Sequence, residues 1–108
     1  MEKTIRIYAK QVKTEKVNFL RFSYTKDGKK YYDVKFMQGS AMPTESGYWL
    51  LTVDLNDVNT AKGKKREGSK YEPNDVLWVK RAISLKKDVD FEKQRKEERL
   101  TALADLLD

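Results

Sequence analysis

Residues 17–37 read VNFLRFSYTKDGKKYYDVKFM, and this stretch predicts an antiparallel β-hairpin. Apolar and polar side chains alternate on both sides of an Asp-Gly pair, which is a frequent hairpin turn. A three-residue loop over 26–28, with Gly28 in a bulge, places Phe22 opposite Tyr32 on one apolar face. A two-residue loop would mix the two faces, so the apolar pattern favours the longer loop.

The other face of the predicted hairpin carries aromatic rings and cations. Its outward residues are Phe19, Arg21, Tyr31 and Lys35. Rings and cations that alternate at strand spacing lie on the same side of a sheet. This face is therefore a candidate binding surface.

Two further stretches, upstream and downstream of the hairpin, are predicted strands. Residues 4–12 alternate between apolar side chains and a polar set that contains Arg6, Tyr8 and Lys10. Residues 47–53 form a nearly continuous apolar run, which is typical of a strand buried on both sides.

The last part of the chain predicts one more strand and a helix. Residues 76–85 alternate as a strand does, but Arg81 interrupts the apolar side and indicates a bulge or an early exit from the core. Asp88 or Asp90 can then cap a helix. Residues 100–107 place leucines and an alanine at helical spacing, which predicts one apolar stripe.

Five strands followed by a helix predict a mainly β protein. The expected fold is a five-stranded antiparallel OB-like barrel over residues 1–87, with an amphipathic, acidic helix over 88–108. The first region holds 19 basic and 10 acidic residues, and the second holds 4 and 7. The net charge of +6 over 108 residues is thus a basic body with an acidic end.

A long basic loop is expected between the last two strands. Residues 54–75 read DLNDVNTAKGKKREGSKYEPND, and a structureless loop of about 20 residues is usually functional or disordered. Its cations suit a mobile finger that contacts an anion, although a merely solvated charge run would have the same composition. They are Lys62, Lys64, Lys65, Arg66 and Lys70.

The composition excludes several classes of function. The chain contains no cysteine and no histidine, which excludes disulfides, thiol nucleophiles, histidine catalysis and zinc sites of the thiolate or imidazole kind. No metal site, cofactor or catalytic constellation is expected. No signal peptide and no apolar run of about 20 residues is visible, so a cytoplasmic location without a membrane partner is expected.

Basic side chains interleaved with rings are the chemistry of single-stranded nucleic-acid binding. Cations neutralise phosphates, while rings stack on bases of any sequence. The candidate residues are Arg6, Tyr8, Lys10, Phe19, Arg21, Tyr31, Lys35, Lys62, Lys64, Lys65, Arg66, Lys70, Tyr71, Trp78 and Lys80.

The aromatic candidates also have structural interpretations. Phe19 can cover a small apolar cluster, Tyr31 can be an ordinary sheet-surface tyrosine, and Trp78 can pack against the helix. Tyr48 and Trp49 are expected in the core rather than at the ligand. Tyr71, inside the basic loop, is assigned to the ligand because no core lies near it in the pattern.

The motifs YYDVKF at 31–36 and LWVK at 77–80, with the basic loop, resemble those of small single-stranded-DNA-binding proteins of phages and mobile elements. The resemblance covers residues 4–85 and implies an OB-like fold and a role in DNA replication or recombination. The C-terminal helix departs from the disordered acidic tip of bacterial single-strand-binding proteins.

We therefore expect a non-enzymatic, sequence-independent binder of single-stranded DNA. Two alternatives stay open, an RNA- or duplex-binding module and a protein-interaction module such as a phage inhibitor of a host nucleic-acid enzyme. The leucine stripe at 100–107 can pack on the barrel, on a second copy or on a partner protein.

Overall fold

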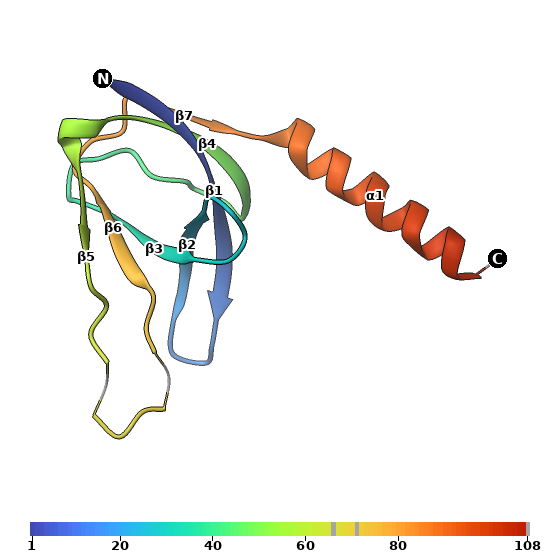
Figure 1. Cartoon of the computed structure of the whole chain (residues 1–108), viewed down its shortest axis with the longest axis horizontal. Helices are drawn as coiled ribbons and strands as arrows, with labels where there is room; N and C mark the ends of the chain where they lie inside the picture. Colours follow the sequence, from blue (N-terminus) through green and yellow to red (C-terminus); the bar gives the residue numbers. More distant parts are fainter. Residues whose placement is uncertain (66, 71, 108) are drawn as a thin grey trace.

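The computed structural model describes residues 1–65, 67–70 and 72–107, which form one mixed β-sheet and a C-terminal helix (Figure 1). The strands are β1 (Glu2–Lys13), β2 (Asn18–Thr25), β3 (Tyr31–Phe36), β4 (Gly47–Asp54), β5 (Val58–Ala61), β6 (Asp75–Val79) and β7 (Ser84–Lys87). A 3-10 helix, η1 (Leu55–Asp57), joins β4 to β5, and helix α1 (Val89–Leu107) follows β7. The expectation of a mainly β protein with a C-terminal helix is confirmed.

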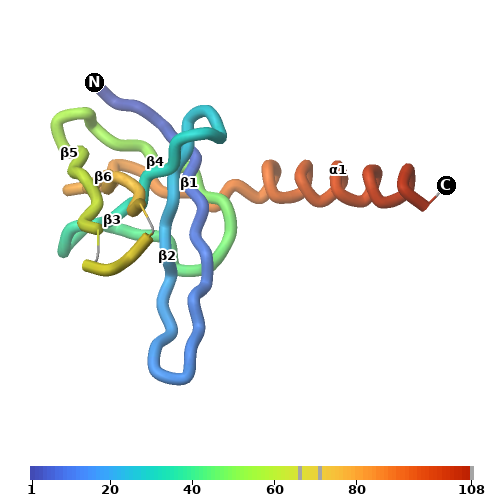
Figure 2. The backbone as a smooth tube through the Cα atoms, turned by 60° about the horizontal axis from the view of Figure 1, so that its bottom comes forward, coloured from blue at the N-terminus to red at the C-terminus, as the bar shows by residue number. Residues whose placement is uncertain are grey.

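The sheet curls so strongly that its two ends approach each other. The strand order is β5-β6-β3-β2-β1-β4-β7, so β4 lies near one edge and β5 forms the other. Only η1 separates these two strands in the chain. Because an extended chain spans at most about 3.6 Å per residue, Asp54 and Val58 lie within roughly 15 Å of each other. In the described part of the chain no ladder joins β5 to β7, and the coiled sheet stays open (Figure 2).

This sheet differs from the expected five-stranded antiparallel barrel. It has seven strands, and β3 pairs with β6 in parallel. The predicted strand at 76–85 is two strands, β6 and β7, because the charged residues after Val79 leave the core. β7 then pairs with β4 and forms the edge of the sheet opposite to β5. The predicted loop at 54–75 also contains η1 and β5. Its basic part is therefore the tip of a hairpin, which we call the β5–β6 arm (residues 62–74).

The β2–β3 hairpin has the predicted faces but a different register. Phe22 lies opposite Val34 and Thr25 lies opposite Tyr31, so the loop spans five residues, 26–30, instead of three. This change moves the pairing by two residues. Since side chains alternate with a period of two, the same residues face the core as predicted.

Hydrogen bonds inside the loop explain its length. The Asp27 carboxylate accepts hydrogen bonds from the backbone N–H groups of Lys29 and Lys30 at 2.8 and 3.1 Å. Gly28 has a φ of +77°, which glycine adopts without strain. The two hydrogen bonds hold the pKa of the Asp27 carboxyl below its ordinary value, the one from Lys29 contributing most.

The core is a single small cluster inside the curl of the sheet. It is formed by Ile7, Ala9, Phe22, Val34, Leu51, Val53 and Val79. Trp49 packs against this cluster, as predicted, and its indole N–H donates a hydrogen bond to the carbonyl oxygen of Glu45 at 3.1 Å. On β1 the polar set faces outward, because Ile7 and Ala9 fill the inner positions. The core thus leaves the outer face of the sheet free.

Asp88 starts the helix, as one of the two predicted caps. Its carboxylate accepts a hydrogen bond from the N–H of Phe91 at 3.2 Å, and its own N–H donates to the carbonyl oxygen of Tyr48 at 2.7 Å. Glu92 adds a second attachment, because its Oε1 accepts the N–H of Tyr48 at 2.7 Å. The first turns of α1 are therefore fixed to the start of β4.

Gly47 permits the contact between Glu92 and Tyr48, and Gly47→Ala should break it. Its φ is +129°, and a Cβ there would collide with the Glu92 carboxylate. We expect a loss of about 1–3 kcal/mol in the free energy of unfolding. Hydrogen exchange should also become faster at the amides of Tyr48 and Phe91.

Gly39→Ala is the matched control for this substitution. Gly39 also has a positive φ, +93°, but a Cβ there would meet no atom within 4 Å. It therefore measures the backbone cost alone. Equal hydrogen-exchange rates at Tyr48 in the two variants would contradict the proposed role of the contact with Glu92.

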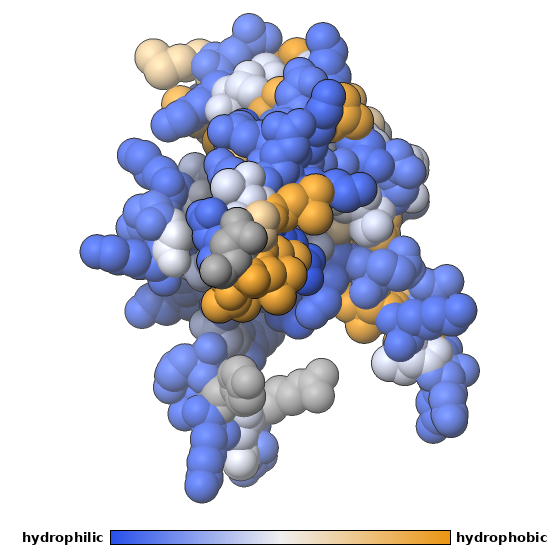
Figure 3. Space-filling view, turned by 90° about the vertical axis from the view of Figure 1, so that its right-hand side faces the viewer, coloured by the Kyte–Doolittle hydropathy of each residue, from blue (hydrophilic) through white to orange (hydrophobic). Residues whose placement is uncertain are grey.

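Beyond its first turns, α1 projects away from the sheet (Figure 1). Leu100, Leu103 and Leu107 are 57, 45 and 82% exposed, and the side view shows a hydrophobic patch at the helix end among polar atoms (Figure 3). The alternative in which this stripe packs on the barrel is therefore wrong. Packing on a second copy or on a partner protein stays a prediction. In the described residues we find no helix with the length and apolarity that crossing a membrane requires.

Candidate nucleic-acid interface

A groove with a volume of about 750 Å³ lies beyond the last β2–β3 pair, Phe22 with Val34. Core-facing side chains line one part of it, namely Leu20, Phe22, Val34 and Phe36, together with Met42. Outward-facing residues of β2, β3 and β6 line the other part. Phe19 and Arg21 line it from β2, Lys35 from β3 and Trp78 from β6. Phe19 and Trp78 are 48 and 38% exposed, so both rings are accessible to a ligand. The structure thus brings four of the predicted residues together.

The two cations of this groove form only weak contacts with other residues of the protein. Lys35 lies opposite Trp78 in the parallel register, with its Nζ 5.6 Å from the ring centroid. Arg21 pairs with Asp33 at 3.5 Å, and the arginine side chain is 62% exposed. Because exposed ion pairs contribute little free energy, a phosphate can replace Asp33 as the partner of Arg21 at small cost.

A second hollow, of about 420 Å³, lies on the same face near the helix. Three predicted residues line it, Arg6, Tyr8 and Tyr31. Arg6 also binds the helix cap, because its Nε lies 2.8 Å from Asp88 Oδ2 and its guanidinium carbon lies 3.8 Å from the Phe91 ring centroid. Arg6 thus has a structural role that its sequence position did not indicate.

Among the residues of this hollow that were not predicted are Tyr48, Phe91 and Arg95. The expectation that Tyr48 lies in the core is wrong, because its ring packs between those of Tyr8 and Phe91 outside the core cluster. The Tyr48 ring lies 4.8 Å from that of Tyr8 and 4.7 Å from that of Phe91, and Arg95 lies over both Tyr48 and Phe91. One signal was available, since Phe91 is the sole aromatic residue after Asp88. The pairing of Tyr8 with Tyr48 depends on the β1–β4 register, which no local pattern reveals.

Lys10 connects the two hollows. It lies opposite Arg21 in the β1–β2 register and is exposed. Tyr8, two residues earlier, lies opposite Ser23 on the same face. The outward side chains of β1 and β2 therefore form one continuous surface from Phe19 to the start of α1.

Two hairpin arms bound this surface at opposite ends of β3. The β5–β6 arm leaves the sheet where β3 begins, because Tyr32 pairs with Asp75. The other arm, formed by residues 10–21 of β1 and β2, extends past the end of β3. Both arms protrude from the sheet (Figure 1), and they diverge in the second view (Figure 2). A ligand on the outer face would lie between them.

The β5–β6 arm carries most of the predicted phosphate contacts. Lys62, Lys64 and Lys70 are exposed and form no ion pair with any other described residue. Lys65 differs, because its Nζ lies 3.1 Å from Glu72 Oε1. Arg66 and Tyr71, which were also predicted to contact the ligand, lie outside the described residues.

Lys80 is the predicted residue that the structure leaves apart. It follows the last residue of β6, at the end of that strand far from the β5–β6 arm. Its backbone N–H donates to the carbonyl oxygen of Asp57 at 2.8 Å, while its side chain is exposed. It lines neither of the two hollows on the outer face.

Over the described ranges, no group of three or more acidic side chains is arranged to hold a metal ion. Compared with known proteins, the chain matches no protein-family model, no curated protein and no solved structure. The function of the site is therefore inferred from the geometry of its rings and cations.

Proposed function

We propose that this protein binds single-stranded DNA without sequence preference, on the outer face of β1, β2, β3 and β6. The observation that carries the proposal is the groove in which Phe19 and Trp78 are accessible beside Arg21 and Lys35. An unpaired strand has free bases that can stack on exposed rings, and its phosphates can contact the neighbouring cations.

The candidate residues would have two roles, stacking on bases and contacting the sugar-phosphate backbone. Phe19 and Trp78, with Tyr31 at the start of β3, would each stack on a base at about 1–3 kcal/mol. Arg21, Lys35 and Lys10 would guide the sugar-phosphate backbone across the strands. The lysines of the β5–β6 arm would bind phosphates and release counterions, which makes the affinity depend on salt.

The curled, partly open sheet and its two arms support an OB-like interpretation of the fold. OB-folds are partly open Greek-key barrels that bind oligonucleotides on the face of strands two and three and on the flanking loops. Here the curl of the sheet and the two arms beside β2 and β3 are compatible with that description. Fold-level likeness is support by analogy, and the rings and cations carry the proposal.

The proposed activity is binding alone, with no catalytic step. The motifs at 31–36 and 77–80 resemble those of phage and mobile-element single-stranded-DNA-binding proteins. On that basis the role would be to hold unpaired DNA during replication or recombination, in the cytoplasm of a bacterial host.

Competition between labelled and unlabelled oligomers tests this function. We expect a labelled dT oligomer to bind with log K falling against log salt at a slope of roughly −3 to −4, for about five phosphate contacts at 0.7 each. Unlabelled dT and dA single strands should compete equally well. A duplex of the same length should compete at least tenfold less well, because its bases offer no free ring faces.

The outcome separates the proposal from its nearest rivals. If the duplex competed as well as the single strand, the protein would be a general polyanion binder and stacking would play no part. If an RNA oligomer competed much better than DNA of the same sequence, the substrate would be RNA. A slope near zero would contradict the phosphate contacts.

A protein-interaction module is the second candidate, because the leucines of α1 are exposed. Leu100, Leu103 and Leu107 would bind a partner protein or a second copy, while the basic arm would insert where nucleic acid normally lies. This alternative requires that the purified protein has no measurable affinity for free DNA. The competition experiment therefore decides between the two candidates.

A further inference from the structure

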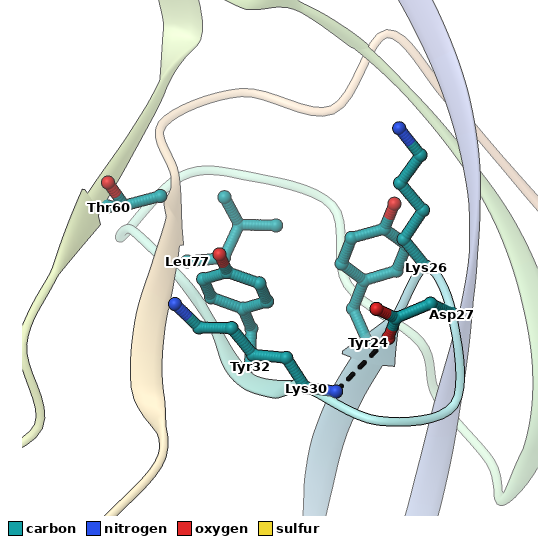
Figure 4. Close-up of a pocket in the computed structure, with 7 residues that line it drawn as sticks. All are labelled: Tyr24, Lys26, Asp27, Lys30, Tyr32, Thr60 and Leu77. Atoms are coloured by element: carbon teal, nitrogen blue, oxygen red, sulfur yellow. Dashed lines mark hydrogen bonds between the residues drawn. The ribbon is translucent and has the colours of Figure 1, made fainter.

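A separate pocket lies on the opposite side of the sheet, under the loop that joins β2 to β3. Its volume is about 360 Å³, which falls at the small end of ligand sites. Tyr24 and Tyr32 form its walls, and Leu77 lies behind them (Figure 4). These three side chains point to the inner face of the curled sheet, since they share the parity of Phe22 and Val34. The pocket is thus distinct from the two hollows described above.

The two tyrosine rings form one aromatic wall. Their centroids lie 6.3 Å apart, their planes are inclined by only 29°, and the rings lie side by side in the pocket (Figure 4). Tyr24 and Tyr32 are directly paired residues, one pair away from the loop, so the strand pairing holds the rings beside each other. A planar ring can stack on this wall at the contact distance of about 3.5 Å between carbon atoms.

Two lysines lie at the rim of the pocket, and only one of them is free of an acidic partner among the described residues. Lys26 is exposed and forms no ion pair within the described ranges. The Lys30 ammonium lies 3.2 Å from the Asp75 carboxylate and 5.1 Å from the Tyr32 ring centroid. The contact with Asp75 raises the pKa of Lys30 above its ordinary value, so this side chain carries its charge at neutral pH.

The one acidic side chain of the lining is already engaged. Asp27 accepts the two backbone hydrogen bonds of the loop, and the one from Lys30 is drawn in Figure 4. Its charge is therefore directed at the backbone. An aromatic wall with the free ammonium group of Lys26 at its rim fits a ligand that combines a flat ring with an anionic group.

We propose that this pocket binds one nucleotide, with its base stacked on the rings of Tyr24 and Tyr32 and its phosphate at Lys26. The nucleotide is either a free mononucleotide or the end of a polynucleotide, because both offer the same base and phosphate. The proposal does not depend on the binding of DNA to the outer face.

Titration with dTMP, followed by NMR of backbone amides and tyrosine rings, tests the proposal. Resonances of Tyr24, Tyr32 and residues 26–30 should shift and saturate, whereas those of Phe19 and Trp78 should not. Lys26→Ala should weaken dTMP binding about two- to fivefold, the effect of one lost contact between exposed charges. Thymidine, which has no phosphate, should bind equally to both forms.

Lys29→Ala is the matched control, because Lys29 lies in the same loop but does not line the pocket. Tyr32→Leu keeps an apolar side chain without the ring and should weaken dTMP binding about 5- to 100-fold. An unchanged pattern of dispersed resonances would show that this variant is folded. Equal affinity of Lys26→Ala and Lys29→Ala for dTMP would overturn the proposal, as would an absence of saturable shifts.

Two further measurements identify the source of the nucleotide and separate this proposal from the first. A dT oligomer with a 5′-phosphate should shift the pocket resonances more than one without it if the natural ligand is a strand end. Equal shifts, with saturation by dTMP, would assign a mononucleotide. The double variant Phe19→Ala/Trp78→Ala should keep dTMP binding whether or not it binds oligomers. Loss of dTMP binding in that variant would contradict a distinct pocket.

Discussion

Replacing Lys62, Lys64 and Lys70 together with alanine should weaken the binding of single-stranded DNA about 100-fold at 0.1 M salt. Each phosphate contact on a single strand contributes about 0.7 to the slope of log K against log salt. Three lost contacts should therefore reduce the steepness of that slope by about 2. The effect should be the same for dT and dA oligomers, because phosphates carry no sequence information.

The matched control removes three positive charges from helix α1. Lys93, Lys96 and Arg99 lie on α1, outside both hollows of the outer face. Their replacement by alanine lowers the net charge by the same amount, but should change the slope by much less. If the two triple variants weakened binding equally, general charge rather than the β5–β6 arm would attract the ligand. Lys65→Ala should have a smaller effect than Lys64→Ala, because Lys65 already pairs with Glu72.

The double substitution Phe19→Ala/Trp78→Ala should weaken the binding of single-stranded DNA without changing its salt dependence. Two lost stacking contacts correspond to about 2–6 kcal/mol, which is a loss of at least 20-fold in affinity. The salt slope should stay the same, because no phosphate contact is removed. Both side chains are more than a third exposed, so the fold should tolerate their loss.

Variants that keep a ring provide the control. Phe19→Tyr and Trp78→Phe preserve an aromatic surface and should recover most of the affinity. Phe19→Leu and Trp78→Leu preserve apolar area alone and should not. If the leucine variants bound as well as the aromatic ones, the groove would act by hydrophobic contact and not by stacking.

For four of the strands, the side that faces the core could be predicted from the sequence. Side chains alternate with a period of two, so the apolar positions of β1, β2, β3 and β6 determined their faces directly. The register of the β2–β3 hairpin was wrong by two residues for the same reason. Hydrogen bonds from the Asp27 loop add two residues to the turn, and a shift of two leaves the alternation unchanged.

The number of strands could not be predicted because two of them are short and polar. β5 has four residues with a single half-buried side chain, Val58, so it has no apolar pattern to recognise. β7 follows β6 after only a few residues, so the sequence pattern predicts a single strand there. Its separation depends on where Lys80 and Arg81 leave the core.

The outer-face groove was largely predictable, and the cluster at the base of the helix was not. Phe19, Arg21 and Lys35 lie on adjacent strands of one hairpin, where parity alone places them together. Tyr48 and Phe91 meet Tyr8 only because β4 pairs with β1 and because Asp88 starts the helix beside Tyr48. Such contacts depend on tertiary structure that the local pattern does not contain.

Fluorescence of Trp78 tests the central claim most directly, once Trp49→Phe has removed the other tryptophan. Trp49 packs against the core, whereas Trp78 lies on the outer face beside Lys35. Adding a dT oligomer at low salt should quench Trp78 to a saturable limit, and salt should reverse the effect. DNA binding that left Trp78 fluorescence unchanged, or no binding at low salt, would contradict the claim that an open face of rings and cations binds unpaired DNA.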